Sequence, residues 1–171
     1  MADLAARDRL QPSLLDRLTD GEPDKQQESR EKRVLSLKQL REAVQRDLTW
    51  LFNTGNFEAF QDLESFPEAA RSVINFGVRD LTGVSSARTS PQELERMLTQ
   101  AILTFEPRIL KQSLKVRAVV DQVEMSKQAL AFEIIGELWA DPTPMQLFLK
   151  TDVDLDTGEV SIRDEYGRGA K

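Results

Sequence analysis

The sequence predicts an α+β fold, in which N-terminal helices pack on a mainly antiparallel four-stranded meander sheet. Three observations lead to this prediction. Apolar residues recur at helical spacing in the first part of the chain, whereas they alternate along the chain in the last part. Turn residues separate the alternating segments. Helices followed by consecutive strands are typical of an α+β domain with an antiparallel sheet.

The first helix of the predicted domain begins after Ser36. Ser36 and Gln39 have the spacing of a capping box, in which each side chain bonds the backbone of the other residue. The helix is expected to end near residues 53–55, Asn-Thr-Gly. Its buried side is expected to consist of Leu37, Leu40, Val44, Leu48 and Leu51, and its outward side to include Arg41, Glu42, Gln45 and Arg46.

Two further helices are expected to begin at prolines, because proline fits the first helical turn. One runs from Pro67 to a stop at Gly77, and its expected buried residues are Ala70, Val73, Ile74 and Phe76. The other begins at Pro91, directly after Ser90 as the cap. Its expected buried residues are Leu94, Leu98, Ala101, Ile102 and Phe105.

Four segments then show strand alternation, with polar turns between them. Gly136 interrupts the second segment and indicates a bulge or a close approach of another group. Asp156, Thr157 and Gly158 predict a hairpin turn in which Gly158 has a positive φ. The alternating residues are Leu114, Val116, Ala118 and Val120, then Leu130, Phe132 and Ile134, then Met145, Leu147 and Leu149, and finally Val160 and Ile162.

The chain divides into three predicted parts. Residues 1–33 form an N-terminal arm with a short helix and a charged linker, residues 34–163 form a single α+β domain, and residues 164–171 form a flexible tail. In the arm, Leu14, Leu15 and Leu18 share one face of the short helix. Two interpretations stay open: the helix docks on its own domain, or it binds a partner protein.

Composition excludes many functions. The 171 residues include no His and no Cys, and the net charge is −6. A Ser-His-Asp triad, a thiolate nucleophile, a disulfide framework and a His- or Cys-based metal site are therefore impossible. We expect no metal and no cofactor. An acidic balance also disfavours nucleic acid as a partner.

The sequence shows no address signal. Its N-terminus lacks the basic start and apolar run of a secretory signal, and no apolar stretch approaches the ~18 residues of a membrane helix. We therefore expect a cytoplasmic protein without direct insertion into a membrane.

Glu106, Pro107 and Arg108 form the strongest candidate site. They stand where the last helix ends and the first strand begins, and Pro107 disfavours helical backbone angles at Glu106. Three interpretations stay open. The Glu106–Arg108 pair holds the corner together, it recognises a partner, or Glu106 is the general acid of a glycosidase. Pairing with Arg108 would favour an ionised carboxylate, which disfavours the last of these.

Four blocks, in order, resemble the TssE family, the small baseplate wedge subunits of type VI secretion systems. They are residues 12–18 (PSLLDRL), 46–54 (RDLTWLFNT), 72–83 (SVINFGVRDLTG) and 105–108 (FEPR). The last block matches a Glu-Pro-Arg signature that is shared with baseplate wedge proteins of contractile-tailed phages. The resemblance extends from about residue 12 to the hairpin near residue 160.

The resemblance implies a structural subunit of the baseplate, not an enzyme. It implies contacts with the wedge proteins TssF, TssG and TssK, and with the sheath proteins TssB and TssC, whose strand pairing the sheet would imitate to start sheath polymerisation. It also implies a location at the baseplate docked on the inner membrane. Glu106, Pro107 and Arg108 would contact wedge and sheath, and Leu14, Leu15 and Leu18 would bind a wedge partner. An older family label, lysozyme-like, supplies the alternative of a peptidoglycan-cleaving enzyme with Glu106 as the acid.

Overall fold

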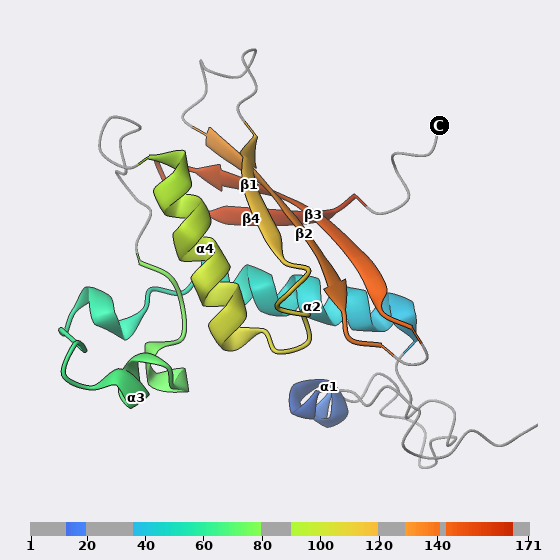
Figure 1. The fold of residues 1–171 in the computed structure, drawn as a ribbon, viewed down its shortest axis with the longest axis horizontal. Coiled ribbons are helices and arrows are strands. Elements are labelled where there is room, and N and C mark those ends of the chain that lie inside the picture. The colour runs from blue at the N-terminus through green and yellow to red at the C-terminus, as the bar shows by residue number, and fades with distance from the viewer. Residues whose placement is uncertain (1–12, 20–35, 80–89, 120–128, 141–142, 166–171) are drawn as a thin grey trace, which may run out of the picture.

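The computed structural model describes residues 13–19, 36–79, 90–119, 129–140 and 143–165 (Figure 1). Its helices precede a four-stranded antiparallel sheet with the strand order β1-β2-β3-β4, so the predicted α+β meander is confirmed. The predicted linker, the turn at 126–128 and residues 166–171 of the predicted tail lie outside the described residues.

Two long helices begin at the predicted capping residues. Helix α2 spans Leu37–Phe52, and both hydrogen bonds of the capping box between Ser36 and Gln39 are present. Helix α4 spans Pro91–Phe105, and the Ser90 hydroxyl accepts a hydrogen bond from the backbone of Glu93. Both helices have strong apolar stripes, and the buried residues of the stripes are Leu40, Val44, Leu48, Leu51, Leu94, Leu98, Ala101 and Ile102.

The sheet pairs each strand with its neighbour in the sequence. Its strands are β1 (Lys115–Val119), β2 (Ala129–Leu138), β3 (Met145–Asp154) and β4 (Val160–Asp164). Gly158 has a φ of 73°, as the predicted hairpin turn requires. At Gly136 the register continues without a bulge, but a Cβ atom there would lie 3.2 Å from Ile109 Cγ2. The close approach is therefore confirmed.

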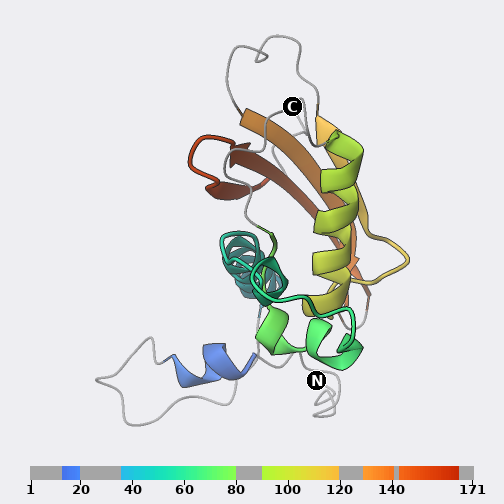
Figure 2. The ribbon, with the colours of Figure 1, turned by 90° about the vertical axis from the view of Figure 1, so that its left-hand side faces the viewer.

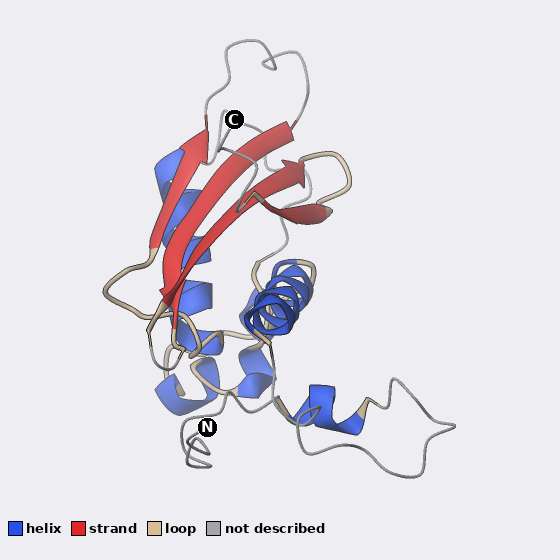
Figure 3. Ribbon diagram, turned by 90° about the vertical axis from the view of Figure 1, so that its right-hand side faces the viewer, coloured by secondary structure: helices blue, strands red, loops and turns tan. Residues whose placement is uncertain are grey.

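Helices α2 and α4 cover one face of the sheet, as the two side views show (Figures 2 and 3). Helix α4 packs against β1, and α2 packs against β3 and β4. The inward residues of the strands join those of both helices in one hydrophobic core, and Phe132, Ile134, Leu147, Leu149, Val153 and Val160 are nearly inaccessible. None of the described helices combines the length and apolar character that a membrane span requires.

The predicted helix from Pro67 to Gly77 is only partly correct. Helix α3 covers Pro67–Ala70, and a separate 3₁₀ helix, η4, covers Val73–Asn75. Val73 and Ile74, which were expected in the core, are exposed. Phe76 does reach the core, because its ring packs edge to face on Phe105 with centroids 5.4 Å apart.

A junction fixes the segment between α2 and α4 at its two ends. Gly55 and Val78 form a parallel bridge, in which Val78 N–H donates to Thr54 O and Asn56 N–H donates to Val78 O. Gly77 has a φ of 126°, and a Cβ atom there would lie 2.3 Å from Thr54 O. Only glycine fits this position without strain.

Candidate functional site

The candidate site is the corner after α4. Glu106 is the C-cap of this helix and has a φ of −118° and a ψ of 80°, so the non-helical backbone expected before Pro107 is confirmed. The chain then runs beside the end of β2. There Trp139 N–H donates to Arg108 O and Leu110 N–H donates to Glu137 O. The corner is thus fastened to both the helix and the sheet.

Glu106 and Arg108 form a two-pronged ion pair. Arg108 Nε donates to Glu106 Oε1 at 2.7 Å, and Arg108 Nη2 donates to Glu106 Oε2 at 2.5 Å. The backbone N–H of Arg108 donates to the same Oε1. Glu106 is only 4% exposed, whereas the side chain of Arg108 is 24% exposed. The acid is therefore buried, and of the two side chains that of Arg108 is the one that solvent reaches.

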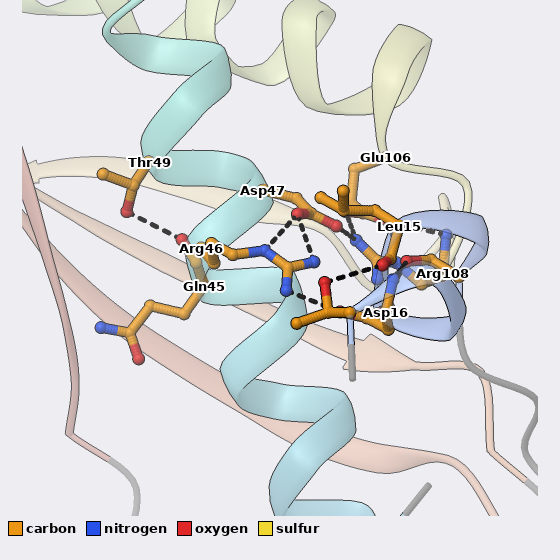
Figure 4. Close-up of polar contacts among 10 residues, drawn as sticks. Leu15, Asp16, Gln45, Arg46, Asp47, Thr49, Glu106 and Arg108 are labelled. Carbon is orange, nitrogen blue, oxygen red and sulfur yellow. Dashed lines mark hydrogen bonds and ion pairs between the residues drawn. The ribbon is translucent and has the colours of Figure 1, made fainter. Parts of the chain in front are cut away.

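The ion pair continues into a longer chain of charges (Figure 4). Arg108 Nη2 lies 2.5 Å from Asp47 Oδ2, and Arg46 Nε donates to Asp47 Oδ1 at 2.9 Å. Arg46 Nη1 then donates to Asp16 Oδ1 at 2.6 Å. We call Asp16, Arg46, Asp47, Glu106 and Arg108 the corner cluster. It joins three elements that lie far apart in the sequence: the arm, α2 and the end of α4.

Hydrogen bonds and opposite charges in the cluster shift the pKa of Arg108, Arg46 and Asp16. Burial by itself would lower the pKa of Arg108, but hydrogen bonds and charges from Glu106 and Asp47 raise it above its usual value. The hydrogen bond to Asp16 raises the pKa of Arg46. Burial would raise the pKa of Asp16, yet hydrogen bonds from Arg46 and Ser13 outweigh it and lower that pKa. The charged forms of Arg108, Arg46 and Asp16 are therefore favoured.

Helix α1 (Leu14–Leu18) is attached to the domain through Asp16. Its cap, Ser13, donates its hydroxyl to Asp16 Oδ2 and accepts from the Asp16 backbone. Leu14 and Leu18 are 71% and 74% exposed, and Leu15 is 43% exposed. The helix thus docks on its own domain by a polar contact, and its leucines stay accessible to a partner.

Sequence reasoning identified the Glu106–Arg108 pair but missed the rest of the cluster. Arg46 was expected on the outward side of the helix, and it does lie outside the core, but there it joins Asp16 to Asp47. Gln45 likewise makes a tertiary contact with β4. A signal was available, since Arg46 and Asp47 open the second of the four blocks that resemble TssE. The partners of Arg46 and Asp47 in the arm and at the corner, Asp16 and Arg108, are too distant in the sequence to be predicted from local spacing.

The two edges of the sheet are protected to different degrees. At β4, the Asn53 side chain donates to Val160 O and accepts from Val160 N–H, and Gln45 Nε2 donates to Ile162 O. At β1, Glu95 of α4 accepts from Ala118 N–H at 2.7 Å, which is the one such bond recorded there among the described residues. Side chains therefore seal β4 more completely than β1.

The cluster has no arrangement that suits metal binding or acid catalysis. In the described part of the chain, no three acidic side chains gather where they could hold a metal ion. Both oxygens of Glu106 accept from Arg108, so neither oxygen is placed to donate a proton to a substrate, as a general acid must. The arrangement suits recognition and the fixing of one element on another.

One comparison with known proteins identifies a family. Residues 38–143, more than half of the chain, match the family described as baseplate wedge protein gp25. The match includes Glu106, Pro107 and Arg108, and it runs from the first turn of α2 to residue 143, between β2 and β3. Neither the curated proteins nor the solved structures provide a match. The chain therefore belongs to the baseplate wedge protein gp25 family.

Proposed function

We propose that this chain is a structural subunit of a type VI secretion baseplate, which joins the wedge to the first ring of the contractile sheath and helps to start sheath polymerisation. Family membership supplies the coarser role of a baseplate wedge protein. The observation that carries the finer proposal is the unequal protection of the sheet edges, because strand addition needs an edge with accessible backbone groups.

The β1 edge is the proposed point of sheath contact. Alternate residues of an antiparallel strand direct their backbone groups away from the neighbour. Ala118 N–H bonds Glu95 rather than β2. The backbone N–H and C=O groups of Val116 and Ala118 are therefore the ones that point away from β2, toward the open edge of the sheet. An incoming strand of TssB or TssC would bond these groups. At β4 it would first have to displace Asn53 and Gln45.

The wedge proteins TssF, TssG and TssK are the proposed partners of the other surface. There the side chain of Arg108 is accessible in part, and the leucines of α1 are exposed. Asp16 connects the two, since it fixes α1 to the corner cluster. A partner that covered Leu14 and Leu18 would therefore lie close to the cluster. In this proposal the protein acts at the cytoplasmic face of the inner membrane, where the baseplate docks.

Two variants that both remove the hydrogen bond between Ala118 N–H and Glu95 test the sheath contact. Ala118→Pro removes the outward N–H of β1 and places a ring at the edge, whereas Glu95→Ala removes only the side chain that occupies this N–H. Both variants lose the same hydrogen bond, so each controls for its effect on stability. We expect Ala118→Pro to reduce the number of sheaths per cell strongly and Glu95→Ala to keep or raise it, counted by electron microscopy. Equal sheath numbers in both variants would contradict the proposal.

A second test concerns the wedge. The double variant Leu14→Ser and Leu18→Ser is expected to lose capture of TssF, TssG and TssK in a pull-down, because two exposed anchors are removed. Leu37→Ser is the matched control, since Leu37 is 51% exposed on the first turn of α2. Retention of all three partners by the double variant would exclude α1 as their binding element.

The peptidoglycan-cleaving alternative makes a separate prediction. An enzyme with Glu106 as its acid would release fragments from purified peptidoglycan, and Glu106→Gln would abolish this activity. We expect no turnover by either protein between about pH 4 and pH 7, the range in which a carboxylic acid with a raised pKa would act as a general acid. Fragment release that depends on Glu106 would restore the enzymatic hypothesis.

A further inference from the structure

The segment between α2 and α4 exposes an unusual amount of apolar surface. We call residues 56–77 the lobe. It contains η3 (Phe57–Ala59), α3 and η4, and it lies at the C-terminal end of α4 (Figures 1 and 2). Phe60 is 84% exposed and Val73 is 83% exposed. Phe57, Phe66 and Ile74 are exposed as well. Single exposed apolar residues are ordinary, but five large ones within one segment of the chain make the lobe a candidate interaction surface.

The lobe has a fixed backbone. Asn75 is buried, and its side chain accepts from Glu58 N–H and donates to Ala70 O, so it ties η3 to α3. Leu63 is buried beneath the turn, and Phe66 N–H donates to Leu63 O. The exposed side chains are therefore presented on an ordered frame, which reduces the entropy lost when a partner binds.

Charge indicates what kind of partner fits. Among the exposed charged residues of the lobe, Arg71 is the single base, and the four acids are Glu58, Asp62, Glu64 and Glu68. One base and four acids give 1 − 4 = −3. An anionic membrane surface and the phosphates of nucleic acid would both be repelled by this charge. The lobe of a second copy would be repelled as well.

We propose that the lobe docks a protein segment whose apolar side chains are bordered by lysine and arginine. Apolar residues of that segment would cover Phe60, Val73 and their neighbours, and its basic residues would face the acids of the lobe. Complementary charge would set the orientation and speed of docking, while apolar burial would supply most of the affinity. This contact uses neither the β1 edge nor the corner cluster, so its test is independent of the tests of the proposed function.

Site-specific photocrosslinking in the cells that make the protein tests the proposal. A photoreactive phenylalanine derivative replaces Phe60 in one strain and Val73 in another, and mass spectrometry maps the crosslinked peptide. The matched control carries the same derivative at Leu37, which is 51% exposed on the first turn of α2, outside the lobe and the corner cluster. We expect both lobe positions to crosslink the same protein segment, and that segment to have a positive net charge and several apolar residues.

The double variant Glu64→Lys and Glu68→Lys provides the second arm. Its crosslinking yield at Phe60 is expected to fall at least about fivefold, because two attractive charges become repulsive. Both residues are exposed, so the melting temperature should stay unchanged. Crosslinks only to lipid, to another copy of this chain or to an acidic segment would overturn the proposal. So would a yield no higher than that of the Leu37 control.

Discussion

Helix α4 and the segment that begins with α3 start in the same way and end differently. Each has a proline in its first turn and apolar residues at helical spacing. Helix α4 continues for 15 residues and buries its stripe against β1. Helix α3 ends after 4 residues, and Val73 and Ile74 beyond it are exposed. The same local signal thus leads to core in one case and to surface in the other.

The difference lies in the residues that follow the first turn. Ser72 donates its hydroxyl to Ala69 O and accepts from Ile74 N–H, so its side chain replaces helical backbone bonds and starts a new turn. In α4 the threonine hydroxyls donate to carbonyls four residues earlier, which leaves the helix intact. A start signal therefore does not determine how far a helix runs or whether its stripe reaches a sheet.

A matched pair of isoleucines tests this comparison most strongly. Ile102 is 0% exposed in α4, and Ile74 is 65% exposed in η4. Ile102→Ala should lower the free energy of unfolding by about 2–5 kcal/mol, because it leaves a cavity in the core. Ile74→Ala should change it by less than about 0.5 kcal/mol. Urea denaturation of both variants measures the two values. Similar losses would mean that Ile74 is buried in solution.

A smaller effect is expected at the junction that holds the lobe. Gly77→Ala forces an alanine into a backbone conformation with positive φ and into contact with Thr54 O. We expect a loss of about 1–3 kcal/mol, with faster amide hydrogen exchange confined to residues 55–78. Gly55→Ala is the control, since nothing lies within 4 Å of the corresponding Cβ position. Uniform loss of protection across the domain would show that lobe and core unfold together.

Thr151 places a polar hydroxyl in the hydrophobic core. Thr151 is 0% exposed, and no described residue bonds its hydroxyl. Thr151→Val replaces this hydroxyl with a methyl group and should raise stability by about 1 kcal/mol, measured as a higher melting temperature. A lower melting temperature would indicate that the hydroxyl has a partner in solution. Either result shows how strictly the core between the helices and the sheet excludes polar groups.

The smallest effect concerns α1, whose exposed leucines resemble those of the lobe but whose anchor is ionic. The pKa of Asp16 lies below its ordinary value of 3.8 in the docked state, so docking is favoured above that pH. As the pH falls through the lowered pKa, Asp16 takes up a proton and α1 is released. Arg46 stacks on Trp50 at 5.2 Å, so a fluorescence change of Trp50 should report the release.

The background for this measurement is Trp139→Phe, which leaves Trp50 as the single tryptophan. Asp16→Asn removes the titrating group and should abolish the step in fluorescence. A step that persists in Asp16→Asn would assign it to another carboxyl group.

Most of the fold could be predicted from the sequence because its signals are local. The Ser36 and Ser90 caps, the alternation in the four strands and the glycine at the last turn each specify their own neighbourhood. The break after α3 could not be predicted in this way. It depends on competition between the Ser72 hydroxyl and the helical backbone, and the spacing of apolar residues does not register this competition.

The candidate site was predictable only in part, for a similar reason. Pro107 and the two-residue separation of Glu106 and Arg108 are visible in the sequence. The contacts of Arg108 with Asp47 and of Arg46 with Asp16 span 61 and 30 residues. Such pairs follow from how α4 crosses α2 and where the arm returns. Neither crossing is encoded by local spacing.

The side chains of Gln45 in α2 and of Asn53 at its end bond the backbone of β4, so the two edges of the sheet are not equivalent. An edge whose carbonyls are already occupied cannot accept a neighbour without breaking bonds first, so growth from this sheet would be one-sided. Two copies of the chain could join β4 to β4 only after these side-chain hydrogen bonds were broken. Under the proposed function, assembly would start at the β1 edge and would not continue from the β4 edge.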